Sequence, residues 1–126
     1  MPTALVVEDR PADRERLVSL LGASGYDVLE TETGREALRL TREWRPDVVI
    51  TDMLVPEMDG LDLARAVRSD PAIAATPIML YAATHEAWEL ERLARAAGIS
   101  LVLPKPADPD AILRDVASLV ETSETA

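Results

Sequence analysis

The sequence predicts an α/β fold in which a parallel five-stranded sheet carries helices on both faces. Short apolar runs of strand length alternate five times with longer segments whose apolar residues recur at helical spacing. This alternation is typical of parallel sheets, because consecutive parallel strands need a crossover connection that a helix supplies. The chain of 126 residues has the length of one such domain.

Five runs are expected to form the strands, at residues 4–7, 26–30, 48–51, 78–82 and 101–103. The run at 48–51 consists only of β-branched residues, as suits a strand that is buried on both faces. Crossovers of this kind are right-handed, and five strands joined by them favour the order 2-1-3-4-5. In that order the first and third strands are neighbours, and ligands bind in the crevice at their carboxyl ends.

Turn and capping residues mark the helix ends. Pro11 fits the first turn of the first helix, which Gly25 ends. Thr33 and Glu36 form a capping-box pattern at the start of the second helix. The remaining helices are expected to begin at Asp59 or Gly60, at Glu86, and at Asp108 or Pro109.

The two tryptophans are expected to lie in different environments. Trp44 belongs to a stripe that should face the core, made of Ala37, Leu40, Thr41 and Trp44. Trp88 should lie nearly opposite the inner stripe of its own helix, which is made of Leu90, Leu93, Ala94 and Ala97. Because exposed tryptophans are common interface anchors, Trp88 is a candidate partner-binding residue.

The composition and length indicate a cytoplasmic protein with a single domain at residues 1–126, which ends in a polar tail at 122–126. The formal net charge of −10 argues against direct nucleic-acid binding, which needs a basic surface. No apolar run approaches the roughly 20 residues of a membrane span, and the N-terminus lacks the basic segment of a signal peptide. The absence of cysteine excludes disulfides and thiolate metal sites.

Acidic residues follow two strands that are predicted to be neighbours. Glu8 and Asp9 follow the first strand, and Asp52 follows the third. Two carboxylates near 4 Å repel by about 4 kcal/mol at an effective dielectric of 20, so such a cluster needs a cation. Lys105, the only lysine of the chain, ends the fifth strand and is one candidate. Since the site offers oxygen ligands only, Mg²⁺ is the other.

Asp52 is the candidate nucleophile of this cluster. Phosphoryl transfer asks a protein mainly for positioning and for neutralisation of charge. A carboxylate nucleophile, a divalent ion with open positions and a lysine supply those parts. The residues therefore predict that Asp52 accepts a phosphoryl group.

Four motifs resemble the receiver domain of two-component response regulators. They are V-V-E-D at 6–9, I-T-D-M-L-V-P-E-M-D-G at 50–60, P-I-M-L at 77–80 and P-K-P at 104–106. The resemblance covers about residues 3–121 and implies a flavodoxin-like (βα)5 three-layer sandwich. It also implies a signalling domain rather than an enzyme, with a downstream effector protein or domain as a partner.

The resemblance assigns roles to the acidic cluster. It implies that Asp52 accepts its phosphoryl group from a histidine kinase or a histidine phosphotransfer protein, and that Lys105 contacts the phosphoryl oxygens. It implies a Mg²⁺ site formed by the side chains of Glu8, Asp9 and Asp52 and by the backbone carbonyl of Leu54. The bond between Lys105 and Pro106 is expected to be cis.

Two positions depart from the family pattern. Receivers carry a Thr or Ser at the end of the fourth strand, and counting from Pro77 this position is Ala82. Counting back from Lys105 instead lets Thr84 approach the site. The switch aromatic of the fifth strand is replaced by Val102. These departures predict an atypical or weaker switch, because a hydrogen bond to a charged group contributes about 1.5–3 kcal/mol and a near-complete population shift needs about 5.5.

Three other functions are alternatives to a phosphorylation switch. The first is a receiver-fold interaction module that works without phosphorylation, which Ala82 and Val102 favour. The second is an aspartyl-phosphate phosphatase, which would need an aspartate where Leu54 stands. The third is an FMN protein, for which Glu8 and Asp9 have the wrong charge. The resemblance further implies that the fourth helix, fifth strand and fifth helix form an output face that could also make a homodimer.

Overall fold

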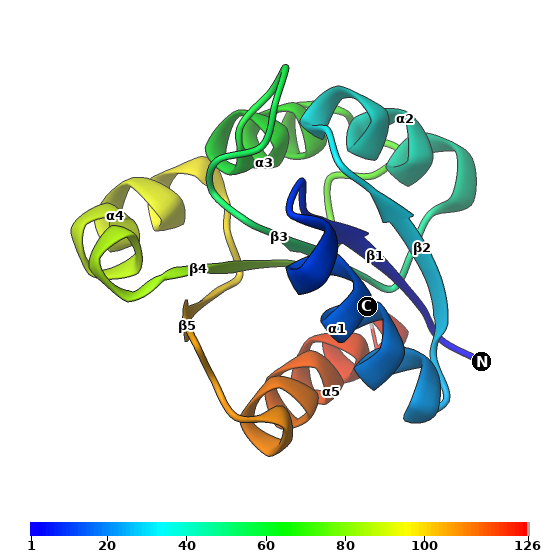
Figure 1. Cartoon of the computed structure of the whole chain (residues 1–126). Helices are drawn as coiled ribbons and strands as arrows, with labels where there is room; N and C mark the ends of the chain where they lie inside the picture. Colours follow the sequence, from blue (N-terminus) through cyan, green and yellow to red (C-terminus); the bar gives the residue numbers. More distant parts are fainter. Residues whose placement is uncertain (126) are drawn as a thin grey trace.

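The structure, a computed structural model, describes residues 1–125, without the side chains of residues 84–86, 124 and 125. Strands and helices alternate along the whole chain (Figure 1). The strands are β1 (Thr3–Val7), β2 (Asp27–Thr31), β3 (Val48–Thr51), β4 (Ile78–Ala83) and β5 (Leu101–Lys105). The helices are α1 (Pro11–Ala23), α2 (Gly34–Trp44), α3 (Gly60–Ser69), α4 (Thr84–Ala97) and α5 (Pro109–Thr125).

The strands form one parallel sheet in the order β2-β1-β3-β4-β5. Helices α1 and α5 cover one face of the sheet, and α2, α3 and α4 cover the other (Figure 1). The predicted α/β class, strand order and flavodoxin-like three-layer arrangement are therefore confirmed. The carboxyl ends of β1 and β3 lie side by side where the order of the strands reverses.

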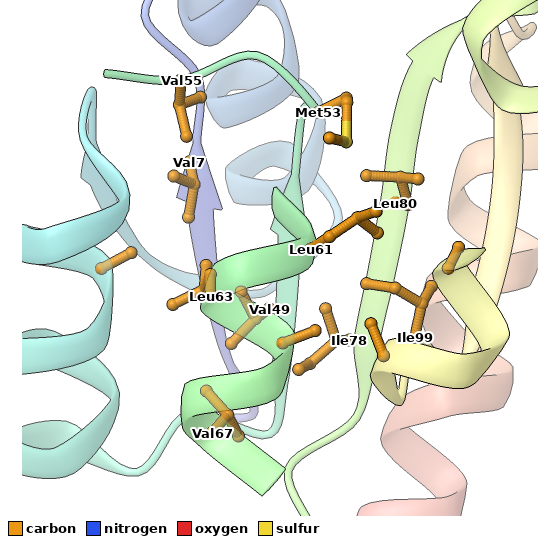
Figure 2. Close-up of a cluster of buried hydrophobic side chains, with 14 of the residues drawn as sticks. Val7, Val49, Met53, Val55, Leu61, Leu63, Val67, Ile78, Leu80 and Ile99 are labelled. Carbon is orange, nitrogen blue, oxygen red and sulfur yellow. The ribbon is translucent and has the colours of Figure 1, made fainter. Parts of the chain in front are cut away.

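The central strands are buried because alternate residues feed two separate cores. In β1, Leu5 and Val7 face the helices α2 to α4, whereas Ala4 and Val6 face α1 and α5. Figure 2 shows the first core, in which Leu63 of α3 packs with Val7 and other residues of the sheet. Apolar contacts on both faces fix the register between neighbouring strands. The register in turn determines which residues lie next to each other at the strand ends.

Capping side chains set where the helices begin. Thr33 Oγ1 accepts a hydrogen bond from the Glu36 amide at 3.2 Å, as the capping pattern predicts. Asp59 Oδ1 accepts one from the Asp62 amide at 2.9 Å at the start of α3. Helix α4 begins at Thr84, two residues before the expected Glu86. Helix α5 continues to Thr125, although a polar tail was expected from residue 122 onward.

Two apolar residues that were expected in the core are exposed. Trp44 is 58% exposed, because the buried stripe of α2 includes Leu38 and is therefore turned away from the side that carries Trp44. Leu93 is 52% exposed, since Ala87, Ala94 and Ala97 form the buried side of α4. Both predictions were wrong because helical spacing alone leaves the rotation of a helix open by about one residue, or 100°.

None of the helices in the described part of the chain is both long enough and apolar enough to cross a membrane.

Candidate functional site

The pairing of β1 with β3 brings the acidic residues together. Val7 pairs with Thr51, so the next residue of each chain segment, Glu8 and Asp52, lies beside the other. The Asp52 amide donates a hydrogen bond to the Val7 carbonyl at 3.1 Å, which continues the ladder to the acid itself. Glu8 and Asp52 are 4% and 9% exposed, so two carboxyl groups are buried at this edge.

The carboxylates of Glu8, Asp9 and Asp52 form a cluster. One carboxylate oxygen from each of Glu8, Asp9 and Asp52 lies within 4.8 Å of the others. Glu8 Oε2 is buried and has no hydrogen-bond partner among the described residues. A buried polar atom without a partner is costly unless something binds it. Hard oxygen donors in such a cluster suit Mg²⁺, so the residues fit the ion predicted for them.

Lys105 supplies the compensating charge. Its ammonium Nζ lies 3.0 Å from Asp52 Oδ2 and 3.1 Å from Glu8 Oε1, and 3.9 Å from Asp13 Oδ2. The pairing of Ala83 with Lys105 places this lysine at the end of the sheet that carries the acids. The structure thus brings together the four residues that the sequence predicted would converge, with Asp13 as a further carboxylate.

The shifts in pKa follow from this geometry. Burial, together with the neighbouring Asp52, raises the pKa of Glu8 to about 7, although the charge of Lys105 opposes the change. Burial alone would lower the pKa of Lys105, but its contacts with Asp52 and Glu8 outweigh that effect and raise the pKa. The lysine is therefore an ammonium ion at neutral pH, held against two acids that repel each other.

The loop between β3 and α3 positions Asp52 through backbone contacts. Asp52 Oδ1 accepts a hydrogen bond from the Met53 amide at 2.7 Å. The Gly60 amide donates to the Met53 carbonyl at 2.9 Å, and a Cβ at position 60 would lie 2.7 Å from the Asp52 carbonyl oxygen. Only glycine allows this close approach of α3 to the acid. The Leu54 side chain is 63% exposed.

The switch positions contain no hydroxyl on the described part of the strands. Ala82 is fully buried in the core beneath α3 and α4, while Ala83 lines the cavity next to Asp52. Val102 is half-buried and pairs with Leu80. The side chain of Thr84 lies outside the described residues. Ala82, the position counted from Pro77, and its neighbour Ala83 both lack a hydroxyl group.

A cavity of about 640 Å³ opens beside the acids, between α1, α5 and the sheet. Glu8, Asp52 and Lys105 line one part of it. Apolar residues line much of the remainder, among them Leu17, Leu20, Ile50 and Ile112. The predicted acceptor therefore borders a cavity on the face of the sheet that α1 and α5 cover.

Sequence reasoning missed two residues that contact this site. The first is Tyr81, because Lys105 Nζ lies over its ring, 5.6 Å from the centroid. Arg14 received no role, yet its Nη1 donates to the Glu8 carbonyl at 2.9 Å. Its Nε pairs with Glu30 at 3.2 Å, which ties the ends of β1 and β2 together. No motif marks either residue, because these contacts depend on how the strands and helices pack.

Two further expectations concern one peptide bond and one side chain. The peptide bond between Lys105 and Pro106 is cis, as expected. Trp88 is 68% exposed on α4, which confirms its predicted position outside the core.

Comparisons with known proteins agree with this geometry. The profile of the response regulator receiver domain family matches residues 4–117. The polar-differentiation response regulator DivK of Brucella anthropi is 32% identical over 104 residues, which are 82% of this chain and 84% of DivK.

Solved structures give the same result. The chemotaxis response regulator CheY4 of Vibrio cholerae is 31% identical with a TM-score of 0.86, covering 94% of this chain and 98% of CheY4. The signal receiver domain of a signal transduction histidine kinase from Syntrophus aciditrophicus is 30% identical with a TM-score of 0.87, covering 96% of this chain and 91% of that one. With this fold, these acids at the ends of β1 and β3, and a match over most of its length, the chain belongs to the response regulator receiver domain family.

Proposed function

We propose that this chain is a phosphoacceptor signalling domain in which Asp52 takes a phosphoryl group from a phosphohistidine of a partner protein. The observation that carries the proposal is the contact of Lys105 Nζ with Asp52 Oδ2 at 3.0 Å, beside the acidic pair Glu8 and Asp9. A structural ion pair would not need two further acids and an unpaired buried oxygen in the same place. The partner is a histidine kinase or a histidine phosphotransfer protein.

The transfer replaces one bond to phosphorus with another. A carboxylate oxygen of Asp52 attacks the phosphorus atom, and a P–O bond forms while the P–N bond of the phosphohistidine breaks. The electron pair of that P–N bond stays on the imidazole nitrogen, which leaves. Lys105 offsets the negative charge on the phosphoryl oxygens, and the backbone contacts of Met53 hold Asp52 in place.

The acidic cluster is the proposed Mg²⁺ site. Glu8, Asp9 and Asp52 would hold the ion with their carboxylates, and Leu54 with its backbone carbonyl. When bound, Mg²⁺ supplies positive charge that offsets the phosphoryl oxygens during transfer. Glu8 Oε2 is the atom in this cluster that most needs a ligand, since it is buried without a partner among the described residues.

Phosphorylation is proposed to act by changing protein–protein contacts. The chain is a substrate of its kinase and a signal to its effector, and it is not itself an enzyme with a released product. The output face is proposed to be formed by α4, β5 and α5, which follow one another at one edge of the sheet. Trp88 is exposed on this face and is the proposed anchor for an effector or for a second copy of the chain.

The direct test is chemical phosphorylation. Incubation with Mg²⁺ and acetyl phosphate should add the mass of one phosphoryl group to the wild-type protein. Asp52→Asn should remain unmodified, because an amide oxygen is a poor nucleophile. Asp62→Asn, which changes an exposed carboxylate on α3, should be modified like the wild type. Intact-mass spectrometry measures all three proteins, and an unmodified wild type would refute the proposal.

A second candidate is an interaction module that works without phosphorylation. The observation in its favour is the absence of a hydroxyl at Ala82 and Ala83, together with Val102 in place of an aromatic. This candidate predicts that Asp52→Asn binds the partner protein as tightly as the wild type does, with or without phosphodonor. Titration calorimetry with a partner found by pull-down from the source cells distinguishes the two functions.

A further inference from the structure

Tyr81 contacts the site at two points, the Lys105 side chain and the backbone of the loop that follows Lys105. It lies near the end of β4 and lines the cavity that also contains Asp52 and Lys105. In the sequence of this strand, I-M-L-Y-A-A, it is the only residue with a hydroxyl group. It is also half-buried, so its ring is held between the sheet and the helices that cover it.

The ring end of Tyr81 contacts the lysine. Lys105 Nζ lies over the ring at 5.6 Å from its centroid, within the range where an ammonium ion is attracted to an aromatic face. The same nitrogen contacts Asp52 at 3.0 Å and Glu8 at 3.1 Å. The position of the ammonium group is therefore shared between the acids and the ring, and a change of charge at Asp52 alters that balance.

The hydroxyl end of Tyr81 contacts the loop between β5 and α5. Its oxygen accepts a hydrogen bond from the Ala107 amide at 3.2 Å, across 26 residues of sequence. Ala107 stands two residues before Pro109, where α5 begins. Since a tyrosine side chain turns about only two bonds and its ring is rigid, its two contacts move together.

No neighbouring residue on β4 or β5 could make this connection. Ala82 and Ala83 have neither a ring nor a hydroxyl, and Val102 is aliphatic. We propose that Tyr81 is a positioning residue that couples the Lys105 ammonium to the loop before α5, so that a change at Asp52 reaches the start of that helix. This inference rests on the proposed function for the event that changes Asp52.

The coupling has a defined direction. A phosphoryl group on Asp52 carries more negative charge than the carboxylate does, so it draws the Lys105 ammonium toward its own oxygens. The ring then loses or changes its contact with the ammonium and turns, and the hydroxyl moves relative to the Ala107 amide. A mutation that removes the Tyr81 hydroxyl should leave the contacts of Lys105 with the acids in place. The Ala107 amide should then respond less to a change at Asp52.

Solution NMR on the isotope-labelled chain of 126 residues tests this inference, with Mg²⁺ and beryllium fluoride as the phosphoryl mimic. In the wild type the mimic should shift the backbone amide signal of Ala107. In Tyr81→Phe, which keeps the ring, the mimic should shift the Ala107 signal by less than half as much as in the wild type. The Lys105 side-chain signals of this variant should match those of the wild type. In Tyr81→Leu the ring-current shift of the Lys105 methylene protons should also disappear. Tyr26→Phe, a hydroxyl deletion outside the cavity lining, should behave as the wild type.

The outcomes separate the two proposals. If the wild type binds the mimic and Tyr81→Phe shows the full Ala107 response, the coupling through Tyr81 is wrong and the proposed function stands. If the Lys105 signals of Tyr81→Leu match those of the wild type without mimic, the ring contact is wrong. If the wild type does not bind the mimic, the proposed function fails and the coupling falls with it. The Ala107 comparison needs only Tyr81→Phe, which removes a single oxygen atom from a packed ring.

Discussion

Lys105 is the residue on which the electrostatics of the site depend. Its ammonium contacts Glu8 and Asp52, whose side chains are 5% and 10% exposed, and its own side chain is 17% exposed. Desolvation makes such a pair costly to build, but breaking it by removing one partner costs more, because the remaining charges stay buried without compensation. The lysine therefore contributes to stability in the metal-free protein as well as to the proposed reaction.

Lys105→Met should lower the free energy of unfolding by about 3 kcal/mol in the absence of metal. This loss of stability is at the low end of the range for broken buried ion pairs, because Glu8 can take up a proton when the ammonium is gone. Urea denaturation in chelator measures it. Arg65→Met, which breaks an exposed ion pair, should change stability by no more than about 0.5 kcal/mol. Equal stability of the two variants would contradict this account of the site.

Glu8 is the residue at which metal binding should be measurable without phosphorylation. Saturating Mg²⁺ at about 100 times its dissociation constant should stabilise the wild type by about 2.7 kcal/mol. Glu8→Gln removes one of two buried carboxylates that share the single ammonium of Lys105, so it should be at least as stable as the wild type in chelator but lose most of the Mg²⁺ effect. Thermal unfolding with and without Mg²⁺ checks this. Glu15→Gln, at an exposed position of α1, should keep the full effect.

Arg68 joins elements at the end of the sheet opposite the acids. From α3, its Nε donates to the Gly98 carbonyl at 2.9 Å, and its Nη1 donates to the carbonyls of Ala74 at 2.9 Å and Thr76 at 2.6 Å. Its Nη2 also contacts Ser100 Oγ at 3.3 Å. One planar guanidinium thus satisfies the turn after α4 and the loop before β4.

Arg68→Ala should destabilise the protein by about 3 kcal/mol, because each lost hydrogen bond contributes about 1 kcal/mol and the half-buried carbonyls lose their partner. Arg68→Lys should recover only a part, since an ammonium cannot reproduce the planar fork. Urea unfolding measures both, with exposed Arg65→Ala on the same helix as the control. Phosphorylation of Asp52 in Arg68→Lys should proceed as in the wild type, because this contact lies at the other end of the sheet. A wild-type stability for Arg68→Ala would show that the clamp is replaceable.

In the whole molecule, the acidic site and the proposed output face lie at different parts of the sheet. Acids at the carboxyl ends of β1 and β3 lie at the centre of the sheet, and β5 lies at its edge (Figure 1). Lys105 belongs to that edge strand but reaches Asp52, so it spans the distance between centre and edge. The exposed Trp88 stands on α4, the helix between β4 and β5 in the chain.

Trp88→Ala should weaken phosphorylation-dependent self-association or effector binding roughly 30-fold, since truncating an aromatic anchor costs about 2 kcal/mol. Sedimentation velocity with Mg²⁺ and beryllium fluoride measures self-association. Trp44→Ala is the matched control, because Trp44 is 58% exposed but lies on α2, away from the proposed output face. Equal effects of the two substitutions would remove the role proposed for Trp88.

The strand order and the location of the site follow from local patterns in the chain. Apolar runs, capping residues and glycines each act within a few residues, and the rules for crossover connections then leave few ways to arrange five strands. Acids that follow the first and third strands must then meet, and Glu8, Asp9 and Asp52 do. A lysine at the end of the fifth strand can reach them, as Lys105 does over 53 residues of sequence to Asp52.

Only the tertiary structure decided how side chains turn and which distant groups they contact. The rotation of α2 exposed Trp44 and buried Leu38, although the spacing of the residues permitted the reverse. The contacts of Tyr81 with Lys105 and Ala107 depend on which face of β4 the ring occupies and on the path of a loop 26 residues later. Such contacts leave no periodic signal, because packing between elements sets them, whereas the propensities that shape each element act only along the chain.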